Sequence, residues 1–230
     1  MGRMQRFDLA GIPLHIVQRG NNRLPCFLDD ADRSRYLRAL EEALLRHDCA
    51  LHAWVLMFNH VHLLVTPASA GAVSRMMHTL GRNYATYFNI RHGRTGTLWE
   101  GRFKSCLVDT DTYLLRCYRY IELNPERAWM VSDPSEYRWS SFAGNACGGD
   151  DPLVTPHSEY LRLGATRADR QHAYAELFAE VLSDSAIAEI RAYLQQQRVL
   201  GHDSFRARVE ARVNRFCNVR PAHRPRLADN

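Results

Sequence analysis

The sequence predicts an α+β fold in which helices flank a ferredoxin-like sheet. Two observations support this prediction. Strand-like and helix-like segments alternate in the order β-α-β-β-α-β over about the first 108 residues. Each of the two helical segments also carries an apolar face, as helices do when they pack against a sheet. This order of elements is that of a ferredoxin-like sheet with its two helices.

The first four elements are predicted from hydrophobic spacing and end signals. In the first helix, Tyr36 and Leu40 recur at helical spacing, and Asp29 or Asp30 is a suitable N-terminal cap. The two strands that follow are joined tightly at residues 58–59. We expect these four elements at about residues 12–18, 31–47, 50–57 and 60–66.

A second long helix and a further strand complete this part of the chain. Val73, Met76 and Leu80 share one face of the helix, which indicates core packing and not a cofactor site. We expect the helix at about residues 71–91 and the strand, or a bent hairpin, at about residues 96–108.

The character of the sequence changes after about residue 145. Residues 144–156 are rich in Gly, Asp and Pro and are typical of a linker. We therefore expect one domain over residues 1–145, and a linker with a mostly helical, basic accessory region over residues 146–230. Within that region we expect helices at about residues 168–182, 185–197 and 203–215, and a basic tail at 220–226.

The basic composition favours a partner with a phosphate backbone. The 230 residues carry a formal net charge of +5, and the isoelectric point of the sequence is about 9.0. Lys104 is the only lysine, and the other cationic side chains are arginines, which bind phosphate and guanine through paired hydrogen bonds. Codon bias in a GC-rich genome explains that ratio at least as well.

Cysteine usage and hydropathy predict a cytoplasmic protein. None of the six cysteines belongs to a Cys-x-x-Cys pair, so we expect free thiols in a reducing compartment. The first residues lack the apolar segment of a signal peptide, and no apolar run is long enough to span a membrane. We therefore expect no membrane partner.

A His-x-His pair is the most informative motif of the chain. His60 and His62 are two residues apart in a β-branched, apolar run, so on a strand both imidazoles point to the same side. Two such rings form half of a divalent metal site. The alternative is a structural pair, because His-x-His arises by chance in a chain with eleven histidines.

A second motif supplies a tyrosine and an amide on one helix face. The segment is expected to begin as a helix with acidic or hydroxyl caps at residues 109–112 and to end near Asn124, before Pro125. Tyr120 and Asn124 are then i and i+4 and lie one above the other. Tyr118 is rotated well away from Asn124 around the helix. Tyr113 lies about 16 Å from Asn124 along the helix axis, at about 1.5 Å per residue. The alternative role of Tyr120 is a core aromatic.

Two polar clusters are candidates for contact with nucleic acid. The first follows the first strand and contains amides and guanidinium groups that can reach phosphates and base edges. In the second, two cations alternate with Phe103 near an indole that could stack on a base. Solvated surface is the alternative for both. The candidate DNA-binding residues are Arg19, Asn21, Asn22, Arg23, Trp99, Arg102 and Lys104.

Taken together, these motifs resemble the HUH superfamily of single-tyrosine transposases, and within it the REP-associated tyrosine transposases. The resemblance covers most of the first 145 residues, and Phe58 departs from it where the family commonly has proline. It implies the HUH nuclease fold for the domain, with metal ligands at His60, His62 and Asn124 and a DNA-attacking tyrosine at Tyr120. The matching blocks are residues 11–23, 59–62, 93–103, 120–128 and 137–141.

The chemistry explains these residue types. A phenol with a pKa near 10 is a weak nucleophile at neutral pH and needs help from deprotonation or from a nearby cation. We expect Mg²⁺ or Mn²⁺ to be bound, a 5′-phosphotyrosine to form, and neither water nor ATP to be consumed. The sequence identifies no general base for the phenolic proton.

The resemblance also implies the substrate and partners. The DNA is expected to be single-stranded and to form hairpins at repetitive extragenic palindromes. The C-terminal region is either an accessory hairpin-binding element or a structural cap, and the protein is either a monomer or a homodimer. Two other functions stay open, namely a DNA-binding regulator without cleavage and a metal hydrolase that uses water. Zinc is less favoured, because no third His or Cys stands at a usual spacing.

Overall fold

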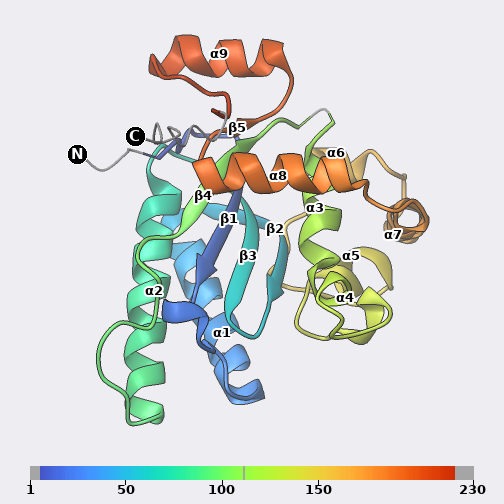
Figure 1. Ribbon diagram of the computed structural model, residues 1–230. Helices are drawn as coiled ribbons and strands as arrows, with labels where there is room; N and C mark the ends of the chain where they lie inside the picture. The colour runs from blue at the N-terminus through green and yellow to red at the C-terminus, as the bar shows by residue number, and fades with distance from the viewer. Residues whose placement is uncertain (1–5, 111, 221–230) are drawn as a thin grey trace, which may run out of the picture.

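The computed structural model describes residues 6–110 and 112–220 and has a five-stranded mixed sheet at its centre (Figure 1). The strand order is β2-β3-β1-β4-β5, and only the pairing of β4 with β5 is parallel. The strands are β1 Leu14–Arg19, β2 Cys49–Leu56, β3 His60–Pro67, β4 Lys104–Val108 and β5 Val199–Leu200.

Four helices cover the sheet. α1 (Asp30–His47) and α2 (Ala72–Arg91) pack on one face, and α3 (Leu114–Glu122) and α8 (Asp184–Gln196) pack on the other (Figure 1). The order β1-α1-β2-β3-α2-β4 confirms the predicted α+β fold with a ferredoxin-like sheet and flanking helices. β3, which carries the His-x-His pair, is an interior strand between β2 and β1.

Local chemistry sets the limits of the two long helices. The side chain of Asp29 accepts a hydrogen bond from the backbone N–H of Asp32 at 3.0 Å and so caps α1, as the sequence indicated. α1 ends at Asp48, whose φ of 51° is left-handed. α2 begins after Gly71, whose φ of 78° suits glycine.

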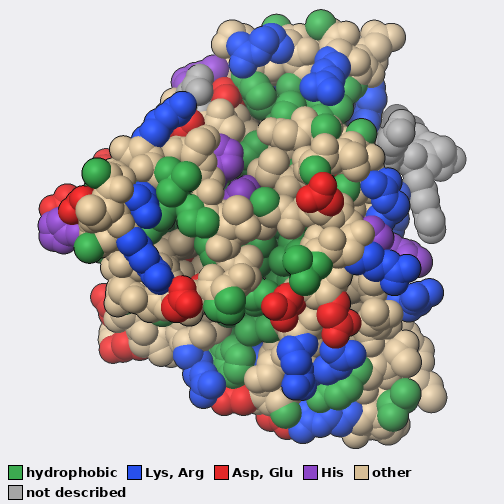
Figure 2. All heavy atoms as spheres, turned by 180° about the vertical axis from the view of Figure 1, so that it is seen from behind, with side chains coloured by type: hydrophobic (Ala, Val, Ile, Leu, Met, Phe, Trp, Pro, Cys, Tyr) green, Lys and Arg blue, Asp and Glu red, His purple; other side chains and the backbone are tan. Residues whose placement is uncertain are grey.

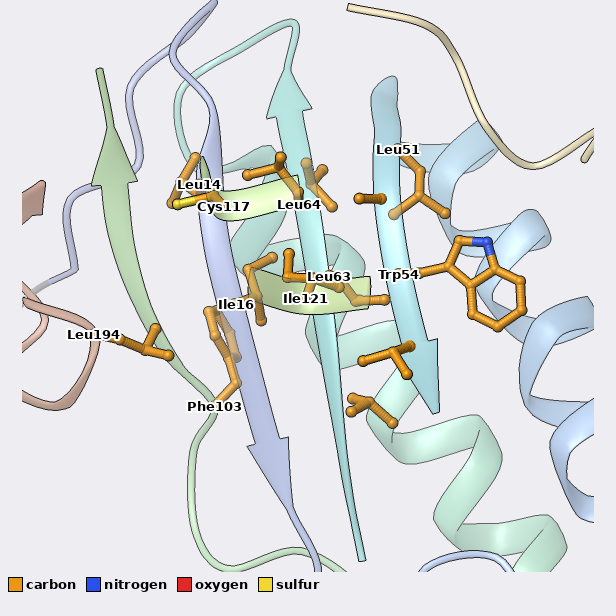
Figure 3. Packing of buried hydrophobic residues seen from close by; sticks show 14 of the residues in the cluster. Leu14, Ile16, Leu51, Trp54, Leu63, Leu64, Phe103, Cys117, Ile121 and Leu194 are labelled. Carbon is orange, nitrogen blue, oxygen red and sulfur yellow. The ribbon is translucent and has the colours of Figure 1, made fainter. Parts of the chain in front are cut away.

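Apolar side chains fill both faces of the sheet. Figure 3 shows Leu14 and Ile16 from β1 beside Leu63 and Leu64 from β3, with Ile121 from α3 close by. These side chains are fully buried, and each contributes about 1.5–3 kcal/mol through removal of apolar surface from water. The core therefore fixes the strands and α3 as one unit.

The chain after the Tyr120 motif adds to this same core. The remaining helices are α4 (Asn124–Arg127), α5 (Phe142–Ala146), α6 (Ser158–Leu161), α7 (Arg167–Glu176) and α9 (Asp203–Val213). Short 3₁₀ turns lie at Asn21–Arg23, Pro134–Glu136 and Leu177–Ala179. Among the described residues, no helix is both long and apolar enough to cross a membrane.

The expected linker is hydrogen-bonded to the sheet. The backbone N–H of Thr155 donates to the carbonyl of Leu51 at 2.7 Å, and the indole of Trp54 donates to Asp151 at 2.7 Å. Both bonds tie the segment to β2, and farther along the chain β5 joins the sheet beside β4. The division near residue 145 stays a prediction, but the two parts share one sheet and one core.

Three expected details differ. Of the strand expected at 96–108, only Lys104–Val108 forms, because Gly96 and Gly101 have positive φ values of 82° and 65° and the chain between them turns. α3 has no side-chain cap, and Asp109 instead accepts a hydrogen bond from the backbone of His202 at 3.2 Å. The expected basic tail lies outside the described residues, except for its first residue.

A buried carboxyl anchors α3 to the later helices. Glu122 is fully buried and accepts hydrogen bonds from Ser141 (2.5 Å), Asn145 (2.8 Å) and Tyr174 (2.6 Å). Burial raises the pKa of Glu122 to about 7, and its three donors only partly oppose this change. α3 is therefore held from its outer side by the segments around α5 and α7.

Charged side chains gather on the side of the molecule that faces away from the viewer in Figure 1. Figure 2 shows basic side chains, here arginines, gathered at the lower end, where α1 begins and α2 ends, with acidic groups among them. At this end Arg91 pairs with Asp29, and Arg33 and Arg138 pair with Asp30. Because these exposed charges are paired, this end is a mixed surface.

We predict that Glu122 makes the free energy of unfolding fall as the pH rises. Its folded pKa of about 7 lies above the ordinary value of 4.5, so the native state binds the proton more tightly than the unfolded chain. This contribution is fully present below pH 4.5 and is lost as the pH rises through about 7. A difference of one in pKa equals about 1.4 kcal/mol, so the total is on the order of 3 kcal/mol.

The measurement is urea unfolding of the wild type and of Glu122→Gln between pH 5 and pH 8. Subtracting the two curves cancels other titrations, and the wild type should lose stability relative to the variant as the pH rises. A pH-independent difference would show that Glu122 does not titrate in this range.

Candidate functional site

The candidate site lies where β1 and β3 meet α3. His60 and His62 point toward α3 from β3, and their ring centroids are 5.2 Å apart. The antiparallel register places Arg19 opposite His60 and Val17 opposite His62. Because side chains on a strand alternate, the same face of β1 also carries His15.

Tyr120 reaches this histidine cluster from α3. Its ring centroid is 5.8 Å from that of His62 and 5.5 Å from that of His15, both in edge-to-face geometry. The side chain is only 4% exposed, so the phenol lies at the bottom of the site. The structure therefore brings together the predicted tyrosine and the predicted His-x-His pair.

Asn124 lies one turn beyond Tyr120, as expected. α3 ends at Glu122, but Leu123 keeps near-helical angles of φ −80° and ψ −2°, so the i to i+4 relation survives. The amide nitrogen of Asn124 donates to the carbonyl of Tyr120 at 2.7 Å and to that of Ile121 at 3.2 Å. No described residue donates to its Oδ1 atom, so this oxygen can accept a ligand.

The hydrogen bonds of His60 define its free nitrogen. Nδ1 lies 2.7 Å from Oδ1 of Asn59, and the amide nitrogen of Asn59 donates to the carbonyl of Arg23 at 2.8 Å. Since Asn59 offers an acceptor, Nδ1 of His60 carries the proton, and Nε2 keeps its lone pair. Burial, with a smaller effect of Arg19, lowers the pKa of His60 to about 4.

His15 is a site residue that the motif search did not single out. Its Nε2 atom lies 2.9 Å from Nδ1 of His62, and both side chains are buried. Burial lowers the pKa of His15 to about 3 and that of His62 well below its ordinary value, so both rings are neutral. His15 lies two residues before Val17 and four before Arg19, so all three side chains share one face of β1. This spacing points to the histidine cluster only when the register of β1 and β3 is known.

The donor set fits a divalent cation. Two neutral imidazoles and one amide oxygen keep lone pairs that no described residue occupies, and each imidazole is oriented by a second hydrogen-bonded group. Among the described residues, no three His, Cys, Asp or Glu side chains form a metal-binding cluster. His60 and His62 therefore have no third ligand of these four types within residues 6–110 and 112–220.

Arg127 completes the surroundings of Tyr120. Its guanidinium carbon lies 4.8 Å from the centroid of the Tyr120 ring. Arg127 is the last residue of α4, seven positions after Tyr120, and so shares its side of the chain. The sequence analysis assigned no role to this residue, although it belongs to one of the blocks that carried the resemblance.

The predicted polar loop lies beside the histidine cluster. Gly20 donates its N–H to the carbonyl of Asn59 at 2.8 Å, and a Cβ atom here would lie 2.3 Å from the carbonyl oxygen of Leu24, so only glycine fits. Arg19, Asn22 and Arg23 are exposed, and Asn21 is half-buried. The loop thus presents two exposed arginines, of which Arg19 lies opposite His60.

The second predicted cluster is arranged differently from the expectation. Trp99 is 6% exposed and donates its indole N–H to the carbonyl of Gly81 at 3.1 Å, so in this structure it is a core residue and not a stacking surface. Arg102 is exposed and lies before β4. Lys104 is half-buried and donates to Gln195 of α8 at 2.8 Å. These cations therefore do not form a continuous strip with Trp99.

Comparison with known proteins gives a consistent assignment. The model of the family described as "Transposase IS200 like" matches residues 9–124, which include all of the elements from β1 to α3. Comparison with curated protein sequences finds no match.

One solved structure supports the same fold. The chain is similar to a REP-associated tyrosine transposase bound to a REP hairpin, with 18% identity, a TM-score of 0.53, and coverage of 68% of this chain and 99% of that chain. A protein of Deinococcus radiodurans assigned as a transposase matches with 20% identity and a TM-score of 0.36, over 53% of this chain and 95% of that chain. From the family match over half of its length, this chain belongs to the IS200-like transposases.

Proposed function

We propose that this transposase cleaves and rejoins single-stranded DNA with Tyr120 as the nucleophile. The phenolic oxygen attacks a backbone phosphorus, and the bond from phosphorus to the 3′ oxygen breaks. The products are a 5′-phosphotyrosine and a free 3′-hydroxyl, so a second DNA end can reverse the reaction. Neither water nor ATP takes part.

The observation that supports this proposal is the position of Tyr120 against the histidine cluster. Its ring lies 5.8 Å from that of His62 by centroids, and Asn124 follows one turn later. Tyr118 has a different environment, because it is stacked on Tyr160 at 6.2 Å on another side of α3. Of these two neighbouring tyrosines, Tyr120 is therefore the one that lies beside the proposed metal ligands.

We further propose that His60, His62 and Asn124 hold a divalent cation, Mg²⁺ or Mn²⁺. The support is that the Nε2 atoms of both histidines and the Oδ1 atom of Asn124 accept no hydrogen bond from the described residues. Imidazole ligands suit Mn²⁺ better than Mg²⁺. When bound, the ion would polarise the scissile phosphate and neutralise part of its charge.

The proposed substrate is DNA that folds into hairpins, of the repetitive extragenic palindrome type. The similar solved structure of a REP-associated tyrosine transposase holds such a hairpin. The formal net charge of +5 and the exposed Arg19 and Arg23 beside the site favour a phosphate backbone. We accordingly place the chain in the REP-associated branch and assign Arg19, Asn21, Asn22 and Arg23 to DNA contact.

Our first prediction here is a covalent adduct. Incubation of the protein with labelled hairpin DNA from the flanks of its own gene and Mn²⁺ should give a slower band on a denaturing gel. EDTA should abolish this band, and so should Tyr120→Phe. The matched control is Tyr118→Phe, which removes a neighbouring buried hydroxyl and should keep the adduct.

The other outcomes identify other functions. Cleavage that persists in Tyr120→Phe without an adduct would mean that water is the nucleophile, as in a metal hydrolase. Tight binding without cleavage in the wild type would identify a DNA-binding regulator.

A second prediction concerns the imidazole pair. His62 can offer Nε2 to a cation only if its Nδ1 donates its proton to His15, so His15 fixes the tautomer. His15→Phe keeps a ring but removes the acceptor, and should weaken Mn²⁺ binding by about 10–100-fold in isothermal titration calorimetry. His15→Gln, which restores an acceptor, should recover part of the affinity.

The matched control is His52→Phe. His52 is also a buried histidine of the sheet, but its nitrogens contact Thr155 (2.7 Å) and Thr66 (2.8 Å) instead of a predicted ligand. This variant should lose stability and keep its Mn²⁺ affinity. Equal affinities of wild type and His15→Phe would overturn the tautomer argument.

A third prediction tests the polar loop. Arg19→Gln and Arg23→Gln should each weaken hairpin binding and lower the slope of log Kd against log salt concentration by about 0.7–0.9, the value for one phosphate contact. Fluorescence anisotropy at several salt concentrations measures both. The control is Arg46→Gln, because Arg46 is an exposed residue of α1 on the opposite face of the sheet. This variant should change neither the hairpin affinity nor the salt dependence. An unchanged slope in the loop variants would remove these residues from the interface.

A further inference from the structure

Arg127 is a half-buried cation without a carboxylate partner in the described part of the chain. Among the described residues it forms no ion pair within 4.0 Å, although nine such pairs occur elsewhere. Its Nη1 atom is buried and has no hydrogen-bond partner. Leaving a buried N–H group of a guanidinium without an acceptor costs free energy, and an anion that accepts from Nη1 would remove this cost.

The neighbours of Tyr120 make Arg127 important. Three side chains pack around the Tyr120 ring, and two of them, His15 and His62, are neutral imidazoles. Arg127 is the third, with its guanidinium carbon 4.8 Å from the ring centroid. Arginine stays protonated in proteins, so it supplies a permanent positive charge beside the phenol.

Arg119 gives the contrast on the same helix. It is a buried arginine that, like Arg127, lies near an aromatic ring, with its guanidinium carbon 5.8 Å from the centroid of Phe178. However, it donates to the backbone carbonyl of Glu180, and the charge of Glu180 also acts on it. Arg119 therefore has a structural partner, whereas the described residues offer Arg127 the Tyr120 side chain as its neighbour.

We propose that Arg127 is a catalytic residue, which binds the scissile phosphate through its unpaired Nη1 group and stabilises the phenolate of Tyr120 during attack. This inference rests on the proposed tyrosine mechanism. Arg127 stays protonated throughout and transfers no proton.

The charges balance along the reaction. The phenolic proton passes to a solvent base, and the phenolate oxygen forms a bond to phosphorus. Negative charge then moves onto the phosphoryl oxygens and finally onto the 3′ oxygen, which takes a proton from solvent. A fixed cation beside both the phenolate and the phosphate lowers the energy of this sequence without having to reorient. In the rejoining reaction the same group stabilises the departing phenolate.

The test is the single-turnover rate of adduct formation with the labelled hairpin and Mn²⁺. Arg127→Gln should slow this rate by about 10²–10³-fold, as the loss of one preorganised donor does. Arg127→Lys, which keeps the charge but not the fork of donors, should be intermediate. Arg119→Gln is the matched control and should keep the rate close to that of wild type.

A second readout separates catalysis from structure. Replacing Tyr120 with fluorinated tyrosines makes the phenol more acidic, so its anion needs less help. The defect of Arg127→Gln should then shrink with each added fluorine. A defect that stays constant across the series, or that comes with a lost Mn²⁺ affinity or a lowered melting temperature, would mean that Arg127 only supports the fold.

The outcomes for the two proposals can be told apart. If wild-type protein forms no Tyr120-dependent adduct, the tyrosine mechanism itself is wrong. If the adduct forms and Arg127→Gln makes it at the wild-type rate, only the role of Arg127 is wrong.

Discussion

The pairing of β1 with β3 is the constraint on which the site depends. Its register sets Arg19 opposite His60 and brings His15 within 2.9 Å of His62. Because side chains alternate along a strand, a slip of one residue would turn these groups to the opposite face, against α1 and α2. Such a slip would also expose Leu14, Ile16 and Leu63 on the wrong side. The same apolar packing that stabilises the sheet therefore fixes the polar cluster.

α3 is held between this cluster and the later part of the chain. Tyr120 faces the histidines, whereas Glu122, two positions later and so about 200° around the helix, faces Ser141, Asn145 and Tyr174. The position of the phenol is thus set from both sides. This arrangement gives the segment around α5 and α7 a physical connection to the site, although it lies outside the stretch matched by the family model.

The sequence was sufficient for the parts of the site that follow from local periodicity. The i and i+2 spacing of His60 and His62 and the i and i+4 spacing of Tyr120 and Asn124 are local, and the structure keeps both relations. His15 and Arg127 became visible only through tertiary contacts, since no local pattern says which strand pairs with β3 or what lies over a ring. The burial of Trp99 could not be predicted for the same reason, because its packing against Tyr84 and Gly81 is tertiary, and its role in DNA contact stays a prediction.

The side chains around Tyr120 that the structure brings together are neutral or positively charged. His15, His60 and His62 are held neutral by burial, which keeps them as lone-pair donors and avoids repulsion of a bound cation. Arg127 contributes a positive charge that no described carboxylate neutralises. A site with neutral imidazoles and a cation without a carboxylate partner favours an anion, and a DNA phosphate is the anion that we propose it binds. The unpaired guanidinium is thus best understood as half of an ion pair whose other half arrives with the DNA.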